Sequence, residues 1–559
     1  MKQKIHRWIF SVSMLSSFAQ AAPDGAMLRQ QIEQSLPPLM PQAAPVLPSP
    51  PPAPMRPTEG NITVLEFRFA GNTLINTDVL LPVVAAWLNR PLDFNQLQQA
   101  TAAVAQVYRD AGWVVRVYLP IQEIINGIIT IQIIEATYGG VIFEGEPLKR
   151  NSPKRLRRML EAQQPVGQPL KAKTLDRTLL ILSDLPGVSV LGSLHEGKQQ
   201  GESEVILKVA DKALLTGDAG VDNTGSRSTG PNRLTANFSL NSPLRFADQA
   251  MLNLMHTEGS NYARLGYSIP LGFEGWRAGV NASAMQYHLV APEMLALNGL
   301  GESYTQGLEV TYPYYRSRLA NVNFSAAYDH KAFDNSSAGA TTTRYQLNTV
   351  LAGINANLTD NILGGGTSSG SLSLITGNVD LAGSPNQAAD ALTTKTAGNF
   401  AKLRYSASRQ QTLINQLGLN ANFSGQFAGK NLDSGERFSL GGSSGVRGYP
   451  SGEVSGSEGM MLNIDLRWPI ASGFTLSGFY DWGAVTVNRN NDFVGKTLQN
   501  QLSLQSVGAS VAWQGQYGLN AKFVWAHRLD DNPNATLSGN DQDGTKILNR
   551  LWLNAGISF

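Results

Sequence analysis

The stretch RLWLNAGISF, residues 550–559, alternates apolar and polar side chains. Successive side chains of a β-strand point to opposite faces, so this stretch predicts a strand with one apolar and one wet face. Trp552 is the exception, since it places a large apolar group in the polar set. Working back from here, we find about sixteen such segments between residues 213 and 559, an even number typical of an antiparallel β-barrel in an outer membrane.

The connections between these segments favour the same fold. Short ones are expected near 271–275 and 471–474, and long ones near 331–341, 429–459 and 530–548. Short periplasmic turns and long outer loops are typical of outer-membrane barrels, whereas a soluble sandwich shares only the alternation. We therefore predict a 16-stranded antiparallel transmembrane β-barrel over residues 213–559.

Composition excludes several classes of protein and site. No run of 18 apolar residues exists, so a membrane-spanning helix is excluded. The net charge of +2 implies no bulk attraction to nucleic acid. The chain has no cysteine, which excludes disulfides, zinc–thiolate sites and cysteine nucleophiles. Six scattered histidines lack the spacing of metal ligands, and we expect no cofactor.

The first 60 residues read as three segments. Residues 1–21 have basic residues, an apolar run and the small-x-small triplet Ala19-Gln20-Ala21, which indicates a secretory signal peptide. Residues 22–36 can form a short amphipathic helix, either a poorly ordered terminus or a tethered helix that reaches elsewhere. Residues 37–60 carry ten prolines and predict a stiff, extended linker.

Residues 61–138 and 139–212 repeat one small plan. Each segment predicts strand, helix, helix, strand and strand in that order. A sheet of this kind keeps an exposed edge, and edge strands accept extended peptides by main-chain pairing. The modules would then bind a passing chain, although a role as spacers is the alternative.

A basic cluster opens the second helix-rich stretch. Its members are Lys149, Arg150, Lys154, Arg155, Arg157 and Arg158. Such a run is most often a solvated face. It could instead meet lipid headgroups or an acidic stretch of a substrate.

Four local motifs make the chain resemble a known family. Two such modules before a C-terminal barrel resemble the POTRA domains of the BamA superfamily. More narrowly, the chain resembles the TpsB transporters of two-partner secretion, the haemolysin/haemagglutinin secretion proteins. The matching stretches are Asp222-Asn223-Thr224-Gly225 with Thr229-Gly230 and Arg233, Val446-Arg447-Gly448-Tyr449, Phe479-Tyr480-Asp481-Trp482-Gly483, and the terminal Phe559.

Two of these motifs have a physical reading of their own. Alternation places Phe479 and Asp481 on the lumen side of their strand, with Tyr480 and Trp482 facing lipid. The glycine-rich connection 429–459 is too long for a tight hairpin, so it can fold inward. The resemblance implies that it does, and that it brings Arg447 to Asp481. The alternative is that Arg447 is a cation at the tip of an outer loop.

The resemblance also implies a function, which is transport and not catalysis. The expected partner is an unfolded exoprotein that the POTRA domains recognise through its N-terminal secretion domain. The outer-membrane lipid and the barrel-assembly machinery, which would read Phe559, are the other expected partners. Residues 22–36 would plug the lumen, and transport could use the lumen or a strand seam opened sideways.

Three competing functions remain in view. A BamA-like insertase of the same superfamily is the alternative, although such proteins usually lack a plug helix. A passive porin would not carry two periplasmic modules. An enzyme would rest only on the G-x-S-x-G matches at 366–370 and 441–445, which lie in Gly/Ser connections that lead to no helix, whereas a nucleophile elbow needs one.

Overall fold

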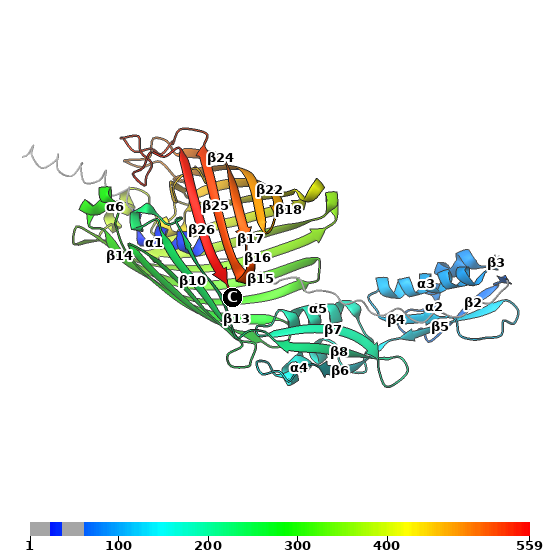
Figure 1. Ribbon diagram of the computed structural model, residues 1–559. Helices are drawn as coiled ribbons and strands as arrows, with labels where there is room; N and C mark the ends of the chain where they lie inside the picture. The colour runs from blue at the N-terminus through cyan, green and yellow to red at the C-terminus, as the bar shows by residue number, and fades with distance from the viewer. Residues whose placement is uncertain (1–22, 36–60) are drawn as a thin grey trace, which may run out of the picture.

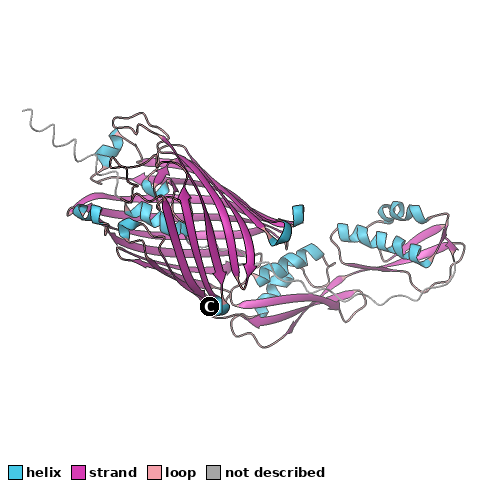
Figure 2. Cartoon of the chain, turned by 45° about the horizontal axis from the view of Figure 1, so that its top comes forward, coloured by secondary structure: helices cyan, strands magenta, loops and turns pink. Residues whose placement is uncertain are grey.

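The computed structural model describes residues 23–35 and 61–559 (Figure 1). A large β-barrel holds a short helix, and two small α/β modules follow one another away from one barrel end (Figures 1 and 2). The expected signal peptide 1–21 and linker 37–60 lie outside the described residues. Within the described part of the chain, no helix combines the length and the apolar character that a membrane crossing needs.

Sixteen antiparallel strands close into one barrel, which confirms the predicted fold class. Each strand pairs with its neighbour along the chain, and the last strand pairs back with the first. The strands are β9 (Leu215–Asp222), β10 (Arg233–Asn241), β11 (Gln249–Thr257), β12 (Ser260–Leu271), β13 (Trp276–His288), β14 (Leu300–Arg316), β15 (Ala320–Ser337), β16 (Ala340–Asp360), β17 (Gly366–Asp380), β18 (Gly398–Thr412), β19 (Gly418–Ala428), β22 (Glu458–Ala471), β23 (Phe474–Thr486), β24 (Gln501–Gln514), β25 (Leu519–Arg528) and β26 (Asn549–Ser558).

The outer face of the barrel is apolar. Leu234, Leu308 and Leu553 expose 54%, 57% and 55% of their surface, as lipid-facing side chains do in a membrane barrel. Near the periplasmic ends of the strands, Trp276 stacks on Tyr312 with ring centroids 4.4 Å apart. Such aromatic pairs match the girdle that barrels place at the membrane interface.

One predicted loop is wrong. The connection near 331–341 is not a long outer loop, because β15 and β16 continue until Ala338 and Gly339 form the turn alone. Both residues have positive φ, 51° and 79°, which suits the primed turns of two-residue hairpins. The strands persist because their inner side chains pack in the lumen, where Phe333 stacks on Tyr345 at 4.9 Å.

The first module follows the predicted order with one small addition. Its sheet has the order β2-β5-β4, and the first strand pairs in parallel with the last. A capping box at Asp93 and Gln96 starts the long helix. The elements are β1 (Ile62–Thr63), β2 (Glu66–Ala70), α2 (Thr77–Val84), η1 (Ala85–Trp87), β3 (Pro91–Leu92), α3 (Phe94–Asp110), β4 (Val115–Tyr118) and β5 (Ile128–Glu135), with β1 and β3 paired separately.

The second module repeats this topology with the order β6-β8-β7. Pro153 opens its first helix, where a missing N–H is harmless. Burial raises the pKa of Tyr138, which lies in the core of the module. The elements are β6 (Thr137–Glu144), α4 (Pro153–Gln163), α5 (Ala172–Ser183), β7 (Val188–Glu196) and β8 (Glu202–Asp211).

Ion pairs attach the second module to the barrel. Arg316, at the end of β14, binds Asp184 through two hydrogen bonds of 2.8 Å, and Arg318 in the following turn pairs with Asp176 at 2.7 Å. Two-point arginine–carboxylate contacts fix orientation as well as distance. The second module is therefore held against the periplasmic turn between β14 and β15.

The barrel closes through a short seam. Five residues of β26, 554–558, pair with β9, whereas β15 and β16 pair along nearly their whole length. A ladder with fewer hydrogen bonds opens at a smaller free-energy cost. The seam is therefore the weakest strand pairing in the barrel wall.

Candidate functional site

Helix α1 (Gly25–Ser35) lies inside the barrel and packs against its wall. The buried side chains of Leu28 and Ile32 contact a lumen cluster that includes Met285 and Tyr287. Polar contacts hold the rest of the helix. These are Gly25 N to Asn335 Oδ1 at 3.1 Å, Arg29 Nη1 to Thr305 Oγ1 at 2.5 Å, Gln30 Nε2 to Arg437 O at 2.7 Å and Ser434 Oγ to Asp24 Oδ2 at 2.6 Å.

Some buried polar groups of α1 lack a hydrogen-bond partner in this position. Arg29 Nε, Gln30 Oε1 and Gln31 Nε2 are buried without a hydrogen-bond partner among the described residues. Each such group costs about 1–3 kcal/mol unless water reaches it. The helix thus occupies the lumen with a polar interface that favours release more than a well-packed apolar interface would.

The inward loop 429–457 runs from β19 to β22 and contains η6 (Ser434–Glu436), β20 (Phe438–Leu440) and β21 (Val454–Gly456). Its tip brings Arg447 against β23. The Arg447 Nη2–Asp481 Oδ1 distance is 2.6 Å, and Nε donates to Asp481 Oδ2 at 2.9 Å. The guanidinium also lies 3.4 Å from the centroid of the Phe479 ring. The structure therefore brings the loop motif and the strand motif together.

Three further partners of this pair were not predicted from the sequence. Asp465 on β22 accepts a second hydrogen bond from Arg447 Nη1 at 2.8 Å. Asn463 Nδ2 and Ser506 Oγ donate to Asp481 at 2.8 Å and 3.0 Å. Asn463 and Asp465 belong to the polar set of their strand, so its alternation carried the signal.

The neighbours of Arg447 in the loop motif are also buried. Val446 and Tyr449 are fully buried, and the Tyr449 hydroxyl donates to Asp530 O at 3.0 Å. Gly448 passes close to the wall, since a Cβ there would lie 2.8 Å from the Cβ of Ser506 and 3.0 Å from Arg528 N. Only glycine fits this approach.

Gly483, the last residue of the strand motif, accommodates the loop in the same way. A Cβ at Gly483 would lie 2.6 Å from Leu440 Cδ2. The loop therefore packs against β23 at two heights, through Leu440 at Gly483 and through Arg447 at Asp481.

The position of Trp552 in the structure explains why this residue departs from the alternation. The indole is 6% exposed and points into the lumen, where it shares a cluster with Phe479, Val524 and Ala526. Its Nε1 donates to Arg447 O at 2.9 Å. The last strand thus provides a second attachment of the loop tip to the barrel wall, besides Asp481.

The first hairpin motif lies at the outer end of the seam. Asp222 binds Arg233 at 2.8 Å and 3.2 Å. The side chain of Asn223 donates to Leu551 O at 3.0 Å and accepts from Leu553 N at 2.8 Å, so it mimics a peptide group of β9. This amide extends the short β9–β26 pairing toward the cell exterior.

Phe559 lies at the periplasmic end of the same seam. Its main-chain N–H donates to Gly217 O at 2.9 Å, while its side chain is 53% exposed on the outer face. The ring faces Phe238 with centroids 6.2 Å apart. The terminal aromatic is accessible from the membrane side.

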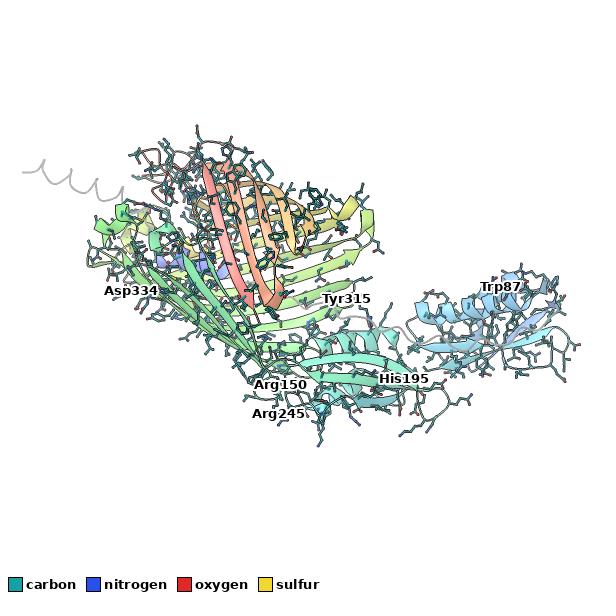
Figure 3. The ribbon with its side chains drawn as sticks, in the orientation of Figure 1. Trp87, Arg150, His195, Arg245, Tyr315 and Asp334 are labelled. Carbon is teal, nitrogen blue, oxygen red and sulfur yellow. The ribbon has the colours of Figure 1, made fainter. Side chains whose placement is uncertain are left out.

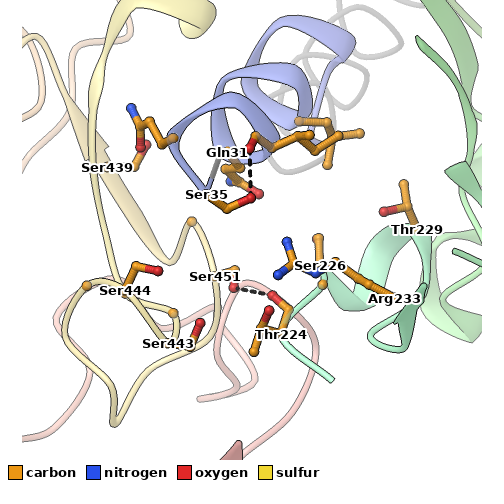
Figure 4. A pocket seen from close by; sticks show the side chains of 18 of the residues that line it. Gln31, Ser35, Thr224, Ser226, Thr229, Arg233, Ser439, Ser443, Ser444 and Ser451 are labelled. Atoms are coloured by element: carbon orange, nitrogen blue, oxygen red, sulfur yellow. Dashed lines mark hydrogen bonds between the residues drawn. The ribbon is translucent and has the colours of Figure 1, made fainter. Parts of the chain in front are cut away.

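A cavity of about 140 Å³ lies between the end of α1, the loop and the first hairpin (Figure 4). Figure 4 shows small hydroxyl side chains around it, and Ser451 Oγ donates to Thr224 O at 3.2 Å. The stretch 441–445 lines this cavity, but 366–370 belongs to β17 and is not a loop as expected. No cluster of His, Asp or Glu suited to a metal was found in residues 23–35 and 61–559.

Comparison with known proteins identifies the family. The family model of the haemolysin secretion/activation proteins ShlB/FhaC/HecB matches residues 201–513, and the ShlB-type POTRA model matches residues 62–136. The chain belongs to the ShlB/FhaC/HecB family. Members of this family are outer-membrane transporters and not enzymes, with the barrel in the outer membrane and the POTRA domains in the periplasm.

Individual relatives agree with this assignment to the ShlB/FhaC/HecB family. The heme/hemopexin transporter HuxB of Haemophilus influenzae is 28% identical over 473 residues, which cover 83% of this chain and 82% of HuxB. The outer membrane transporter CdiB of Dickeya dadantii is 23% identical over 478 residues, covering 83% and 81%.

Solved structures show the same fold. CdiB from Escherichia coli superposes with a TM-score of 0.69 at 18% identity, covering 99% of this chain and 97% of that one. BamA from Haemophilus ducreyi lacking POTRA domains 1–3 has a TM-score of 0.51 at 16% identity, covering 89% and 100%. The ShlB/FhaC/HecB family therefore shares its barrel architecture with BamA.

Proposed function

We propose that this transporter recognises one unfolded partner exoprotein through its POTRA domains and moves it across the outer membrane. The observation that carries the proposal is a lumen occupied by two parts that are not strands of its wall, α1 and the inward loop 429–457, next to two periplasmic modules. A passive pore has no use for such modules. The free energy for transport would come from folding of the exoprotein outside the cell.

Recognition would use the edge strands of the two modules. In each sheet the last strand is central and the other two are edges, so β2 and β6 can accept an extended chain. Main-chain pairing is tolerant of sequence, and this suits a substrate that arrives unfolded. The second module is fixed at the barrel mouth through Arg316 and Asp184, so a chain paired there lies next to the lumen.

Passage would require two movements. Helix α1 must leave the lumen, and its partly unsatisfied polar contacts favour this. The inward loop must also shift. This movement either breaks the Arg447–Asp481 pair or moves β23 together with the loop. Removal of one partner of a buried ion pair costs about 3–5 kcal/mol, so the pair sets a substantial barrier to spontaneous opening.

Secretion of an exoprotein encoded beside this gene tests the proposal. The intact chain, a deletion of residues 61–212 and Arg447→Ala would be compared, with the outer-membrane level of each variant measured in parallel. Arg344→Ala is a matched control, because this arginine pairs with Asp334 at the exposed end of a hairpin. We expect exoprotein in the medium with the intact chain and the control, and little with the other two variants.

A BamA-like insertase is the second candidate, and the short β9–β26 seam favours it. An insertase would affect many barrel proteins and not one exoprotein. If secretion is unchanged in all variants while other barrel proteins disappear from the outer membrane of the deletion strain, the insertase assignment replaces ours.

A further inference from the structure

The first periplasmic turn, residues 242–248 between β10 and β11, has an unusual shape. Ser242, Arg245 and Ala247 have positive φ values of 56°, 63° and 56°, which side chains rarely adopt. The fully buried Asp248 stabilises this shape by accepting the N–H groups of Leu244 and Phe246, each at 3.2 Å. The turn is therefore a defined structure.

This turn presents apolar side chains at the rim of the barrel. Leu244 is 73% exposed and Phe246 is 46% exposed. Apolar groups at the tip of a built turn, beside a membrane-spanning wall, are typical of residues that enter the interfacial layer of a bilayer. Arg245 lies between them and is exposed.

Helix α4 of the second POTRA module is attached beside this turn. Ser242 Oγ donates to Arg150 O at 2.7 Å, and the guanidinium of Arg155 lies 4.1 Å from the centroid of the Phe246 ring. Figure 3 shows Arg150 and Arg245 close together at the corner where this module meets the barrel. The start of α4 therefore lies at the level of the periplasmic rim.

The exposed side of α4 is strongly basic. Residues 149–158 include six Lys or Arg and no Asp or Glu, although the whole chain has a net charge of only +2. Lys154, Arg157 and Arg158 are exposed, and none of them has an ion-pair partner in the described ranges 23–35 and 61–559. Asp211 accepts the N–H groups of Lys149 and Arg150, and Glu161 follows one turn further along α4.

These charges do not serve the helix itself. Cations in the first turns of a helix oppose its macrodipole, which favours acidic residues there. Lys154, Arg157 and Arg158 are spaced so that they share one helix face. Arg157 also lies 5.8 Å from the centroid of the Phe143 ring of β6, on the flank of α4 away from Arg155. We call these three cations and Arg245 of the neighbouring turn the basic face.

We propose that the basic face and the tip of the 242–248 turn bind anionic phospholipid headgroups of the periplasmic leaflet. The cations would contact the headgroups while Leu244 and Phe246 enter the apolar layer beneath them. An acidic segment of the exoprotein would use the charges but leave the apolar tip in water, so the observations favour lipid. Lipid binding would hold the second POTRA module close to the membrane and beneath the barrel mouth.

The full chain in neutral detergent provides the test. Native mass spectrometry would count bound phosphatidylglycerol during titration, with phosphatidylcholine as the uncharged reference. The test variant replaces Lys154, Arg157 and Arg158 by Gln. The matched control replaces three exposed cations away from the rim, Arg90, Arg109 and Lys198, by Gln. The heat-modifiable gel shift of the barrel would verify folding of each variant.

The expected result is a selective loss of anionic lipid. Each cation near an anionic surface contributes about fivefold in affinity, so the triple variant should weaken phosphatidylglycerol retention on the order of a hundredfold. The control should retain it, and Leu244→Asn should weaken phosphatidylglycerol binding without changing how steeply that binding falls with added salt. In nanodiscs containing phosphatidylglycerol, α4 should be protected from hydrogen exchange in the intact chain and not in the triple variant.

Two results would overturn the proposal. Equal phosphatidylglycerol retention by the test variant and the control would exclude the basic face as a lipid site. Unchanged lipid binding combined with loss of exoprotein secretion in the triple variant would assign the basic face to the exoprotein instead. Neither result would affect the proposed secretion function, since that function rests on the lumen and the modules.

Discussion

Trp552 and Arg447 are joined by a hydrogen bond from the indole Nε1 to the main-chain oxygen, 2.9 Å long. Trp552 belongs to β26, which forms the shortest strand pairing of the barrel with β9. Arg447 belongs to the inward loop. The loop tip is therefore held both by the seam strand and by Asp481 of β23. We propose that movement of the loop and opening of the seam are connected through this contact.

Loss of Arg447 should release the loop tip. Arg447→Ala leaves Asp481 fully buried without its cation. The expected loss of stability is about 3–5 kcal/mol, and hydration of the Asp481 carboxylate would reduce it. We expect faster hydrogen exchange in the loop residues around 447 and a strong loss of secretion. Arg447→Lys should recover only part of both, because lysine cannot make the two-point contact with Asp481. Equal protection in wild type and Arg447→Ala would contradict this role.

Replacement of the indole should have a smaller effect. Trp552→Phe keeps an aromatic ring against Phe479 but removes one hydrogen bond, worth about 0.5–1.5 kcal/mol. We expect a modest decrease in the temperature at which the folded barrel loses its gel shift. Trp525→Phe, on the exposed face of the neighbouring strand, is the control and should leave this temperature unchanged. The connection proposed above fails if the two variants behave alike.

A disulfide should tie α1 to the inward loop. A Cβ at Gly435 would lie 2.8 Å from the Cβ of Ala26, so a cysteine pair there needs a shift of only about 1 Å to reach ordinary disulfide geometry. The natural chain has no cysteine, so the introduced pair can form the only disulfide. Ala26→Cys with Gly435→Cys should abolish secretion when oxidised and recover it on reduction.

Each single cysteine variant is the control for the locked pair, and both should secrete under oxidising conditions. Full secretion by the oxidised double variant, with the disulfide verified by its gel mobility, would mean that α1 can remain bound to the loop during transport.

Glu453 should make the outer loops sensitive to pH. Burial raises the pKa of Glu453 to about 8, against hydrogen bonds from Asn532 and the Gln542 N–H. Because the pKa in the folded loop exceeds the ordinary 4.5, the packing is fully stable below about pH 4.5. It weakens by up to about 1.4 kcal/mol per pH unit as pH rises toward 8, then levels off.

The pH dependence of the loop packing would be measured between pH 5.5 and 8 by hydrogen exchange of loop 529–548, corrected for the intrinsic exchange rate. We expect Glu453→Gln to remove the dependence, since it keeps the acceptor oxygen without the charge. Glu458→Gln is the control, because this carboxylate pairs with Arg489 near the surface. A dependence that persists in Glu453→Gln would contradict the assignment of the effect to Glu453.

The alternation of side chains, together with the alternation of short and long connections, predicted the barrel and its sixteen strands. It also placed Phe479 and Asp481 on the lumen side, because the faces of a strand depend only on whether a position is odd or even. The repeated strand–helix–helix–strand–strand plan was readable for the same reason, since each module is built from contacts that are local in sequence. The motif around Arg447 indicated which loop would fold inward.

The tertiary structure alone decided which inward side chains meet. Trp552 and Arg447 are separated by 105 residues and meet across the lumen, as Asp184 and Arg316 meet across the junction of module and barrel. Alternation assigns a face but neither a height nor a position around the barrel, and those follow from strand register. The same limit made the hairpin at 338–339 look like a loop, because one contact to its inner face comes from the distant helix α1, where Gly25 N donates to Asn335 Oδ1.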